Sequence, residues 1–343
     1  SSVDHKVSTE TVSKVADNDM LDRMLDPFRG NNSKGFAPCG VICLHVDDLF
    51  MAGNKEFDTR VLKRLRTDYN IGSEDTDDIA FVGQRIRWIK GNGATAPHIR
   101  VDQQLAVDDL HEIVFERSLK EDILCTPYLH TEYRSVLGMI NWLQSRTQFQ
   151  SCYKFSRNAS RQASPTIGDC RNVNKLVRAI KAAPVALHFW PLQGQLRLLG
   201  FPDASYKNNE DKSSQRALTI FLAEDRSTKA STDARGSLIE YESHKITQTT
   251  MSTTVAELYA LMKCFGTCLF LKGLWADISG QNLKLHLRTD ANNLVTTAKT
   301  THQPEQKETI HLIQMLRRES NSHLAYLGRK TFHTNLLRFF DLQ

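Results

Sequence analysis

The stretch GFPDASYKNNEDKSSQRALTIFL, residues 200–222, begins and ends in residues typical of β-strands and carries an aspartate just after the first of them. Its flanks extend both strands, to QLRLLGF at 195–201 and to RALTIFLA at 216–223. Asn, Asp and Ser fill the connection between them, as they do in turns between paired strands. We therefore predict two neighbouring strands, with Asp203 at the end of the first.

The segments around this pair predict a mixed sheet flanked by helices. Two more segments have strand composition, VALHFW at 185–190 and GSLIEYES at 236–243. A long apolar helix at 252–278, a strand LKLHLRTD at 283–290, a short helix from Ala291 and a helix at 304–319 follow. The order of elements is thus β-β-β-α-β-α after residue 190.

Three acidic residues of this half lie where the predicted elements end or begin. Asp203 follows a strand, Glu257 lies in the first turn of the long helix, and Asp290 ends a strand. Carboxylates in such positions can converge although they are far apart in sequence. A cluster of hard oxygen ligands suits Mg²⁺ or Mn²⁺, and a pair of such ions can clamp the attacking and leaving oxygens of a phosphodiester.

Each of the three acids also has a purely structural interpretation. Asp203 in PDAS has the composition of a turn residue. Thr254 and Glu257 have the spacing of a capping box, and Asp290 can be the N-cap of the helix that begins at Ala291. The spacing alone does not decide between these roles and metal binding.

Three segments of this half resemble the RNase H domain of Ty1/copia-type retrotransposon Pol polyproteins: GFPDASYKNNEDKSSQRALTIFL, STTVAELYALMKC and HLRTDANNLVTTAK. The resemblance implies that Asp203, Glu257 and Asp290 bind two metal ions that hydrolyse the RNA strand of an RNA–DNA hybrid. It also implies that the region of Asn293 lies near the substrate backbone. The family's fourth carboxylate has no clear match in the divergent carboxy-terminal segment, where Asp341 is the candidate ligand.

An earlier stretch, GVICLHVDDLFMAG at 40–53, sets two aspartates inside an apolar run. Burial of an ionised carboxylate is costly unless it is paired or binds a metal. We predict a hairpin with a buried first strand and with Asp47 and Asp48 at its turn. It resembles the reverse transcriptase motif Y-V-D-D-[ML], which implies that Asp47 is the firmer metal ligand and that Asp48 lies beside it.

Residues 101–183 have a mainly helical pattern and resemble the family's thumb and connection. The basic residues that can follow phosphates there are Arg134, Arg146, Lys175 and Arg178, although each can equally belong to a solvated helix face. In all, the resemblance extends from Gly40 to Glu319. We therefore expect α+β and α/β architecture in two domains: a loosely ordered polar lead-in at 1–39, a partial reverse transcriptase palm with thumb/connection at 40–190, and an RNase H-like domain at 191–343.

The expected function follows from which parts of this family are matched. Polymerisation also needs a first palm aspartate and the fingers, which lie before the hairpin in the family, so we do not expect polymerase activity. Weak two-metal RNase H activity is the leading expectation, with an RNA–DNA hybrid and the rest of a Pol polyprotein as partners. The alternative is a non-enzymatic or inactive remnant that binds nucleic acid.

The composition limits the class of protein and its cellular location. Apolar residues make up 40% of the 343-residue chain and charged residues 24%, which is typical of globular proteins, and the net charge of +5 permits nucleic-acid binding. The amino-terminal residues have no signal-peptide pattern, and we expect no membrane partner and no secretion. By family analogy we expect a cytoplasmic virus-like particle and/or the nucleus. The seven cysteines favour buried thiols over a zinc site at Cys39/Cys43 and Cys264/Cys268.

Overall fold

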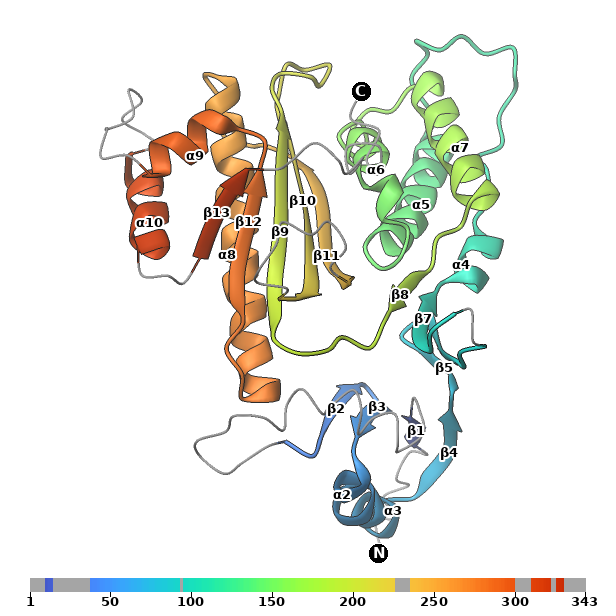
Figure 1. Ribbon diagram of the computed structural model, residues 1–343. Helices are drawn as coiled ribbons and strands as arrows, with labels where there is room; N and C mark the ends of the chain where they lie inside the picture. The colour runs from blue at the N-terminus through green and yellow to red at the C-terminus, as the bar shows by residue number, and fades with distance from the viewer. Residues whose placement is uncertain are drawn as a thin grey trace, which may run out of the picture.

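The computed structural model describes residues 10–14, 38–92, 95–225, 235–299, 310–321 and 325–329. Their strands form one five-stranded sheet and two four-stranded sheets. In Figure 1 the five-stranded sheet stands between the long helix α8 (Thr253–Ser279) and a group of helices formed by α5 (Pro127–Gln144), α6 (Cys152–Ala159) and α7 (Ile167–Ala182). The two smaller sheets belong to the first half of the chain.

The large sheet has the strand order β11-β10-β9-β12-β13. Its strands are β9 (Leu196–Ser205), β10 (Gln215–Glu224), β11 (Gly236–Lys245), β12 (Lys284–Thr289) and β13 (Ala325–Arg329). The first three form an antiparallel meander, and β12 and β13 add to it in parallel. This is the mixed sheet flanked by helices that the sequence predicts, and the expected α+β fold class is confirmed.

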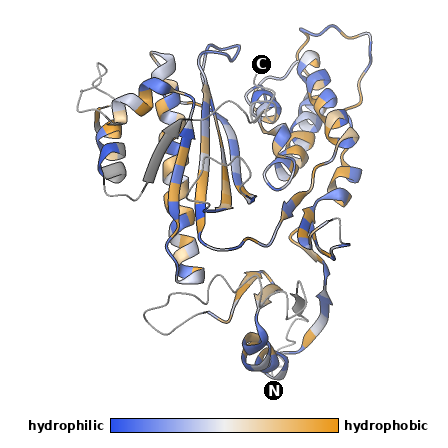
Figure 2. Cartoon of the chain, viewed as in Figure 1, coloured by the Kyte–Doolittle hydropathy of each residue, from blue (hydrophilic) through white to orange (hydrophobic). Residues whose placement is uncertain are grey.

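Helix α8 covers one face of this sheet. Figure 2 shows apolar residues along β9, β10 and α8, whose contact forms the main core of the second half. α8 is also long and apolar enough to cross a membrane, with a mean hydropathy of 1.4 over an 18-residue window. Half of that window is buried inside the protein, as in the core helix of a soluble domain, so its composition is weak evidence for a membrane span.

The opposite face of the sheet contacts the helical region. Phe149, in the short 3-10 helix Phe149–Ser151, has its ring centroid 5.7 Å from that of Tyr241 in β11. Gln215 of β10 donates to Ser156 Oγ of α6 at 3.1 Å and to Ser243 Oγ of β11 at 3.0 Å. The 3-10 helix and α6 therefore pack against the sheet, and the helical region also encloses a core of its own.

The first half contributes two smaller sheets. One has the order β5-β6-β7-β8, and the other has the order β2-β3-β1-β4. Their strands are β1 (Glu10–Lys14), β2 (Gly40–His45), β3 (Asp48–Gly53), β4 (Ile71–Thr76), β5 (Asp78–Phe81), β6 (Gln84–Ile89), β7 (His98–Asp102) and β8 (Leu187–Phe189). The expected loose lead-in thus contains a strand, β1, while residues 1–9 and 15–37 lie outside the described residues.

A helical segment with a π-helical turn follows the hairpin. It comprises α2 (Lys55–Phe57), a π-helix (Asp58–Leu62) and α3 (Lys63–Asp68). Phe57 packs onto the paired Gly40 and Gly53 of the hairpin, where a Cβ on either glycine would collide with its ring. The remaining helices are α4 (Gln104–Asp109), α9 (Asn292–Lys299) and α10 (Ile310–Asn321).

The hairpin differs from the prediction in two respects. The residues of its turn are Val46 and Asp47, because His45 pairs with Asp48 across the strands. The first strand is also not buried, since Leu44 is 69% exposed and Ile42 is 41% exposed. β2 is the edge strand of its sheet and pairs only with β3 within the described residues.

Candidate active site

Asp203 lies inside a regular strand and not in a turn. β9 continues to Ser205, and Asp203 pairs with Ala217 of β10 in an unbroken antiparallel ladder. β9 is the central strand of the sheet, between β10 and β12. The turn interpretation of Asp203 is therefore wrong, and its carboxylate is carried by the most firmly held strand of the domain.

Glu257 is held by helix α8 but does not cap it. The N-cap is Ser252, whose side chain accepts a hydrogen bond from the backbone N–H of Val255 at 3.3 Å. The helix therefore begins one residue before Thr254, and the predicted capping box of Thr254 and Glu257 does not form. Glu257 is only 8% exposed, so burial without a structural capping role makes it a candidate ligand.

Asp290 follows β12 directly. It does not cap the next helix, because α9 begins at Asn292 and its first backbone hydrogen bonds, from Leu294 and Val295, are accepted by the carbonyl of Ala291. Ala291 itself donates its N–H to Thr289 Oγ1 at 3.1 Å. The N-cap interpretation of Asp290 is therefore wrong as well.

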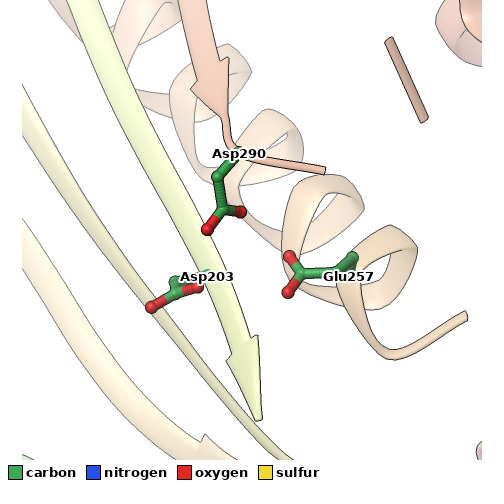
Figure 3. Close-up of side chains that lie close together, drawn as sticks. All are labelled: Asp203, Glu257 and Asp290. Atoms are coloured by element: carbon green, nitrogen blue, oxygen red, sulfur yellow. The ribbon is translucent and has the colours of Figure 1, made fainter. Parts of the chain in front are cut away.

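The three carboxylates meet at one place. Each offers one oxygen, and these oxygens all lie within 4.8 Å of one another. Figure 3 shows Asp203 on β9, Asp290 at the end of β12 and Glu257 on α8 around a common space. The donor set consists of carboxylate oxygens without thiolate or imidazole, which fits Mg²⁺ or Mn²⁺ and does not resemble a structural zinc site.

Among the described residues, no other group of three His, Cys, Asp or Glu side chains is close enough to hold an ion. The cysteine pair in α8 is instead part of the core, since Cys264 and Cys268 are both fully buried. The hydrogen bond with the Cys268 thiol, together with burial, raises the pKa of Cys264, so this thiol stays protonated. The pair acts as small apolar side chains above β9.

The hairpin turn, which contains Asp47 and precedes Asp48, is strained at Val46. Val46 has φ 57, a conformation that a β-branched residue rarely adopts, and its side chain is 83% exposed. Asp47 is exposed and Asp48 is half-buried at the start of β3. Such strain is a feature of functional turns, but within the described residues no third metal-binding side chain joins this pair.

The five residues that the sequence suggested for nucleic-acid contact do not form one patch. Arg134 and Asn293 are exposed on α5 and α9. The Arg146 guanidinium lies 5.0 Å above the Trp142 ring, and Arg178 pairs with Glu112. Lys175 alone of these five lines the cavity beside α6 and α7. Asp341, the candidate fourth carboxylate, lies outside the described residues.

That cavity contains basic residues which the sequence analysis missed. Arg157 and Arg161 are four residues apart, a spacing that places both side chains on one side of a helical segment. The spacing within SRNASR was the available signal.

The fold and the site together define a mixed five-stranded sheet with helices on both faces and a three-carboxylate centre, preceded by a helical region and two small sheets. No protein-family model matches the sequence. No curated protein matches it either.

Solved structures similar to parts of the chain were found, at low sequence identity. LC11-RNase H1, solved with an RNA/DNA hybrid, is 12% identical, with a TM-score of 0.30 over 41% of this chain and 90% of that chain. RNase H1 from Halobacterium salinarum NRC-1 is 15% identical, with a TM-score of 0.27 over 42% and 89% of the two chains. A foamy viral protease-reverse transcriptase, also solved with an RNA/DNA hybrid, is 16% identical with a TM-score of 0.45. That match covers 93% of this chain, which spans 38% of the viral chain.

Proposed function

We propose that this protein hydrolyses the RNA strand of RNA–DNA hybrids at the site formed by Asp203, Glu257 and Asp290. The observation that carries the proposal is the convergence of the three carboxylates within 4.8 Å from β9, α8 and β12. The structural roles that competed for these residues, a turn, a capping box and an N-cap, are all filled by other residues or absent.

Asp203, Glu257 and Asp290 would hold the divalent ions, Mg²⁺ or Mn²⁺. When bound, such ions supply an activated water and neutralise the charge on the leaving oxygen of the phosphodiester. The chain's own contribution is rigid placement, since two ligands come from paired strands and one from a helix fixed by its N-cap. Asn293, exposed at the start of α9, is then available to the sugar–phosphate backbone.

We assign the chain, as part of the same proposal, to a Ty1/copia-type retrotransposon Pol polyprotein. The order of motifs in the sequence supports this, from the VDD hairpin at 46–48 to the acidic motifs of the second half. Asp47 and Asp48 then derive from a polymerase palm. The other Pol segments are the expected protein partners, and virus-like particles in the cytoplasm and/or the nucleus are the expected location.

Cleavage of a fluorescently labelled RNA–DNA hybrid tests the nuclease proposal. The wild-type protein should cut the RNA strand when Mg²⁺ or Mn²⁺ is present and stop when EDTA is added. Asp203→Asn should lower the rate at least about 100-fold, because a ligand oxygen that anchors the ions is lost.

Asp277→Asn is the matched control, since it makes the same substitution at an exposed position of α8 away from the site. It should cleave at the wild-type rate. If the wild type cleaves no faster than Asp203→Asn, the nuclease proposal fails. Retained binding of the hybrid would then favour the alternative, a nucleic-acid-binding remnant without enzymatic activity.

A further inference from the structure

A polar cavity of about 400 Å³ lies between helices α6 and α7 and the connection from β9 to β10. Five cationic side chains line it: Lys154, Arg157, Arg161, Lys175 and Lys245. They come from α6 and the turn after it, from α7 and from the end of β11. Three carboxylates also line the cavity: Asp169, Glu210 and Asp211. The hydrogen bonds and ion pairs of these carboxylates decide which of the cations an added anion can bind.

Two of these carboxylates have local roles. Asp169 accepts from the N–H of Thr166 at 2.9 Å and completes the capping box of α7. Asp211 accepts from the N–H of Ser213 at 3.0 Å and pairs with Lys245, whose hydrogen bond lowers the pKa of Asp211 well below its usual range. Both carboxylates thus stabilise the chain segments that carry them.

Glu210 differs because it reaches across to the helical region. One oxygen accepts from Arg157 at 2.6 Å, and the other pairs with Arg161. The glutamate side chain is 58% exposed and each arginine is 46% exposed, so water reaches all three groups. The arrangement is that of a two-oxygen anion held by two guanidinium groups, which is also how arginines hold a phosphate.

The cavity is aligned with the carboxylate site along the sheet. Gln215, which lines the cavity, pairs with Ser205, and Ser205 is two residues beyond Asp203 on the same face of β9. Two residues of a strand span about 7 Å. A nucleic acid whose scissile phosphate lies at Asp203 can therefore place a neighbouring part of its backbone at the cavity.

We propose that this cavity is a binding site for a backbone phosphate of the nucleic-acid substrate, and that Glu210 occupies the place of this phosphate until the substrate displaces it. The inference rests on the proposed function for the identity of the ligand. Arg157 and Arg161 bind the phosphate oxygens, Lys154 and Lys175 add positive charge, and Glu210 competes with the substrate for the two arginines.

Binding of a labelled RNA–DNA hybrid, followed by fluorescence anisotropy, tests the site without cleavage when every variant also carries Asp203→Asn. Glu210→Gln should bind about 3- to 10-fold more tightly, because the competing charge is removed and the amide keeps the size of the side chain. The salt dependence, expressed as log K against log salt concentration, should become steeper by about one unit for the phosphate gained. Arg157→Gln/Arg161→Gln should bind at least about 10-fold more weakly.

Glu121→Gln is the matched control. Like Glu210→Gln, it removes a carboxylate that pairs with an arginine, here Arg171 of α7, but Glu121 does not line the cavity. Its affinity and salt slope should equal those of the parent. A hybrid with single uncharged methylphosphonates, placed at each position in turn, identifies the phosphate: one position should abolish the gain given by Glu210→Gln.

An unchanged or lower affinity of Glu210→Gln, with a lower melting temperature, would overturn the proposal. The role of Glu210 would then be to stabilise the contact between the β9–β10 connection and α6 through its ion pairs. The outcome is separable from that of the cleavage test. If the wild type cleaves hybrids but Glu210→Gln binds no tighter, this inference alone fails. If Glu210→Gln binds tighter but no protein cleaves, the phosphate site stands and the nuclease proposal fails.

Discussion

Gly200 of β9 lies directly beneath Cys264 of α8, so closely that a Cβ on Gly200 would come 2.7 Å from the Cys264 Sγ. It would also come 2.9 Å from Leu287 Cδ2 of β12. Gly200→Ala should therefore overpack the core and lower the free energy of unfolding by about 1–3 kcal/mol, measured by urea denaturation.

Two further variants make this prediction specific. Cys264→Ala removes the nearest atom, so the double variant should be more stable than the sum of the two single effects predicts. Gly266→Ala is the control, because a Cβ there meets nothing within 4 Å, and it should stabilise α8 by about 0.5–1 kcal/mol. Equal losses at Gly200 and Gly266 would contradict the packing explanation.

Ser252→Ala should destabilise the start of α8. Loss of the side chain that accepts from Val255 N–H costs about 0.5–2 kcal/mol, and the residues that fray include the turn carrying Glu257. We expect a lower unfolding free energy and a weaker response of the melting temperature to Mg²⁺. Thr253→Ala, at an exposed position in the same turn, should leave both quantities nearly unchanged.

Asp290→Asn should have opposite effects with and without metal. Without divalent ions, three carboxylates with oxygens within 4.8 Å repel one another, and neutralising one should raise the unfolding free energy by about 1 kcal/mol. The variant should lose the Mg²⁺-dependent rise in melting temperature that ligand binding gives the wild type. A metal response equal to that of the wild type would show that Asp290 is not a ligand.

His286 makes the stability of the second half depend on pH. Burial, helped by the charge of Arg197, lowers the pKa of His286 to about 4, whereas an unfolded histidine titrates near 6.5. Between these values the unfolded chain binds more protons, so stability is full above pH 6.5 and falls as the pH drops towards 4. His286→Gln should lose less stability from pH 7.5 to pH 4.5 than the wild type does, by on the order of 1–3 kcal/mol in urea titrations.

Exposed His244 provides the control for that experiment. His244→Gln should retain the pH dependence of the wild type. If His286→Gln also retains it, buried His286 does not account for the loss of stability in acid.

Val46→Gly should stabilise the hairpin. Glycine adopts φ 57 without strain, so relief of the left-handed conformation should add about 1 kcal/mol to the unfolding free energy. Val41→Gly, within β2, should instead cost about 0.5–1 kcal/mol, because a glycine in a strand loses more conformational freedom. Destabilisation by Val46→Gly would mean that the exposed valine side chain makes a contact that outweighs the strain.

Much of the second half could be predicted from the sequence because its strands alternate clearly. Leu196 and Leu198 face α8, while Arg197 between them is less buried, and this pattern of period two identifies β9. β13 was missed because Ala325–Arg329 is only five residues long and contains a glycine. Such a strand is defined by pairing with β12, which a local pattern does not contain.

At the candidate site, too, the local sequence pattern was not sufficient to predict the structure. Ser252, Thr253 and Thr254 are all acceptable N-caps, so the sequence could not decide whether Glu257 lies in a capping box. The extended backbone of Ser252, with φ −153 and ψ 165, decides it. The sequence predicts the turn at the two aspartates because aspartate tolerates turn conformations, whereas the pairing of His45 with Asp48 places Val46 in the turn.

The parallel pairing of β9 with β12 also has a consequence for how the carboxylate centre forms during synthesis. The β9–β10–β11 meander can form from neighbouring segments, but β12 is made only after the whole of α8. Asp203 and Glu257 can therefore be in place on a growing chain while Asp290 is still absent. The carboxylate centre is completed by a late, non-local pairing step, so a nascent or stalled chain holds an incomplete centre until β12 has docked.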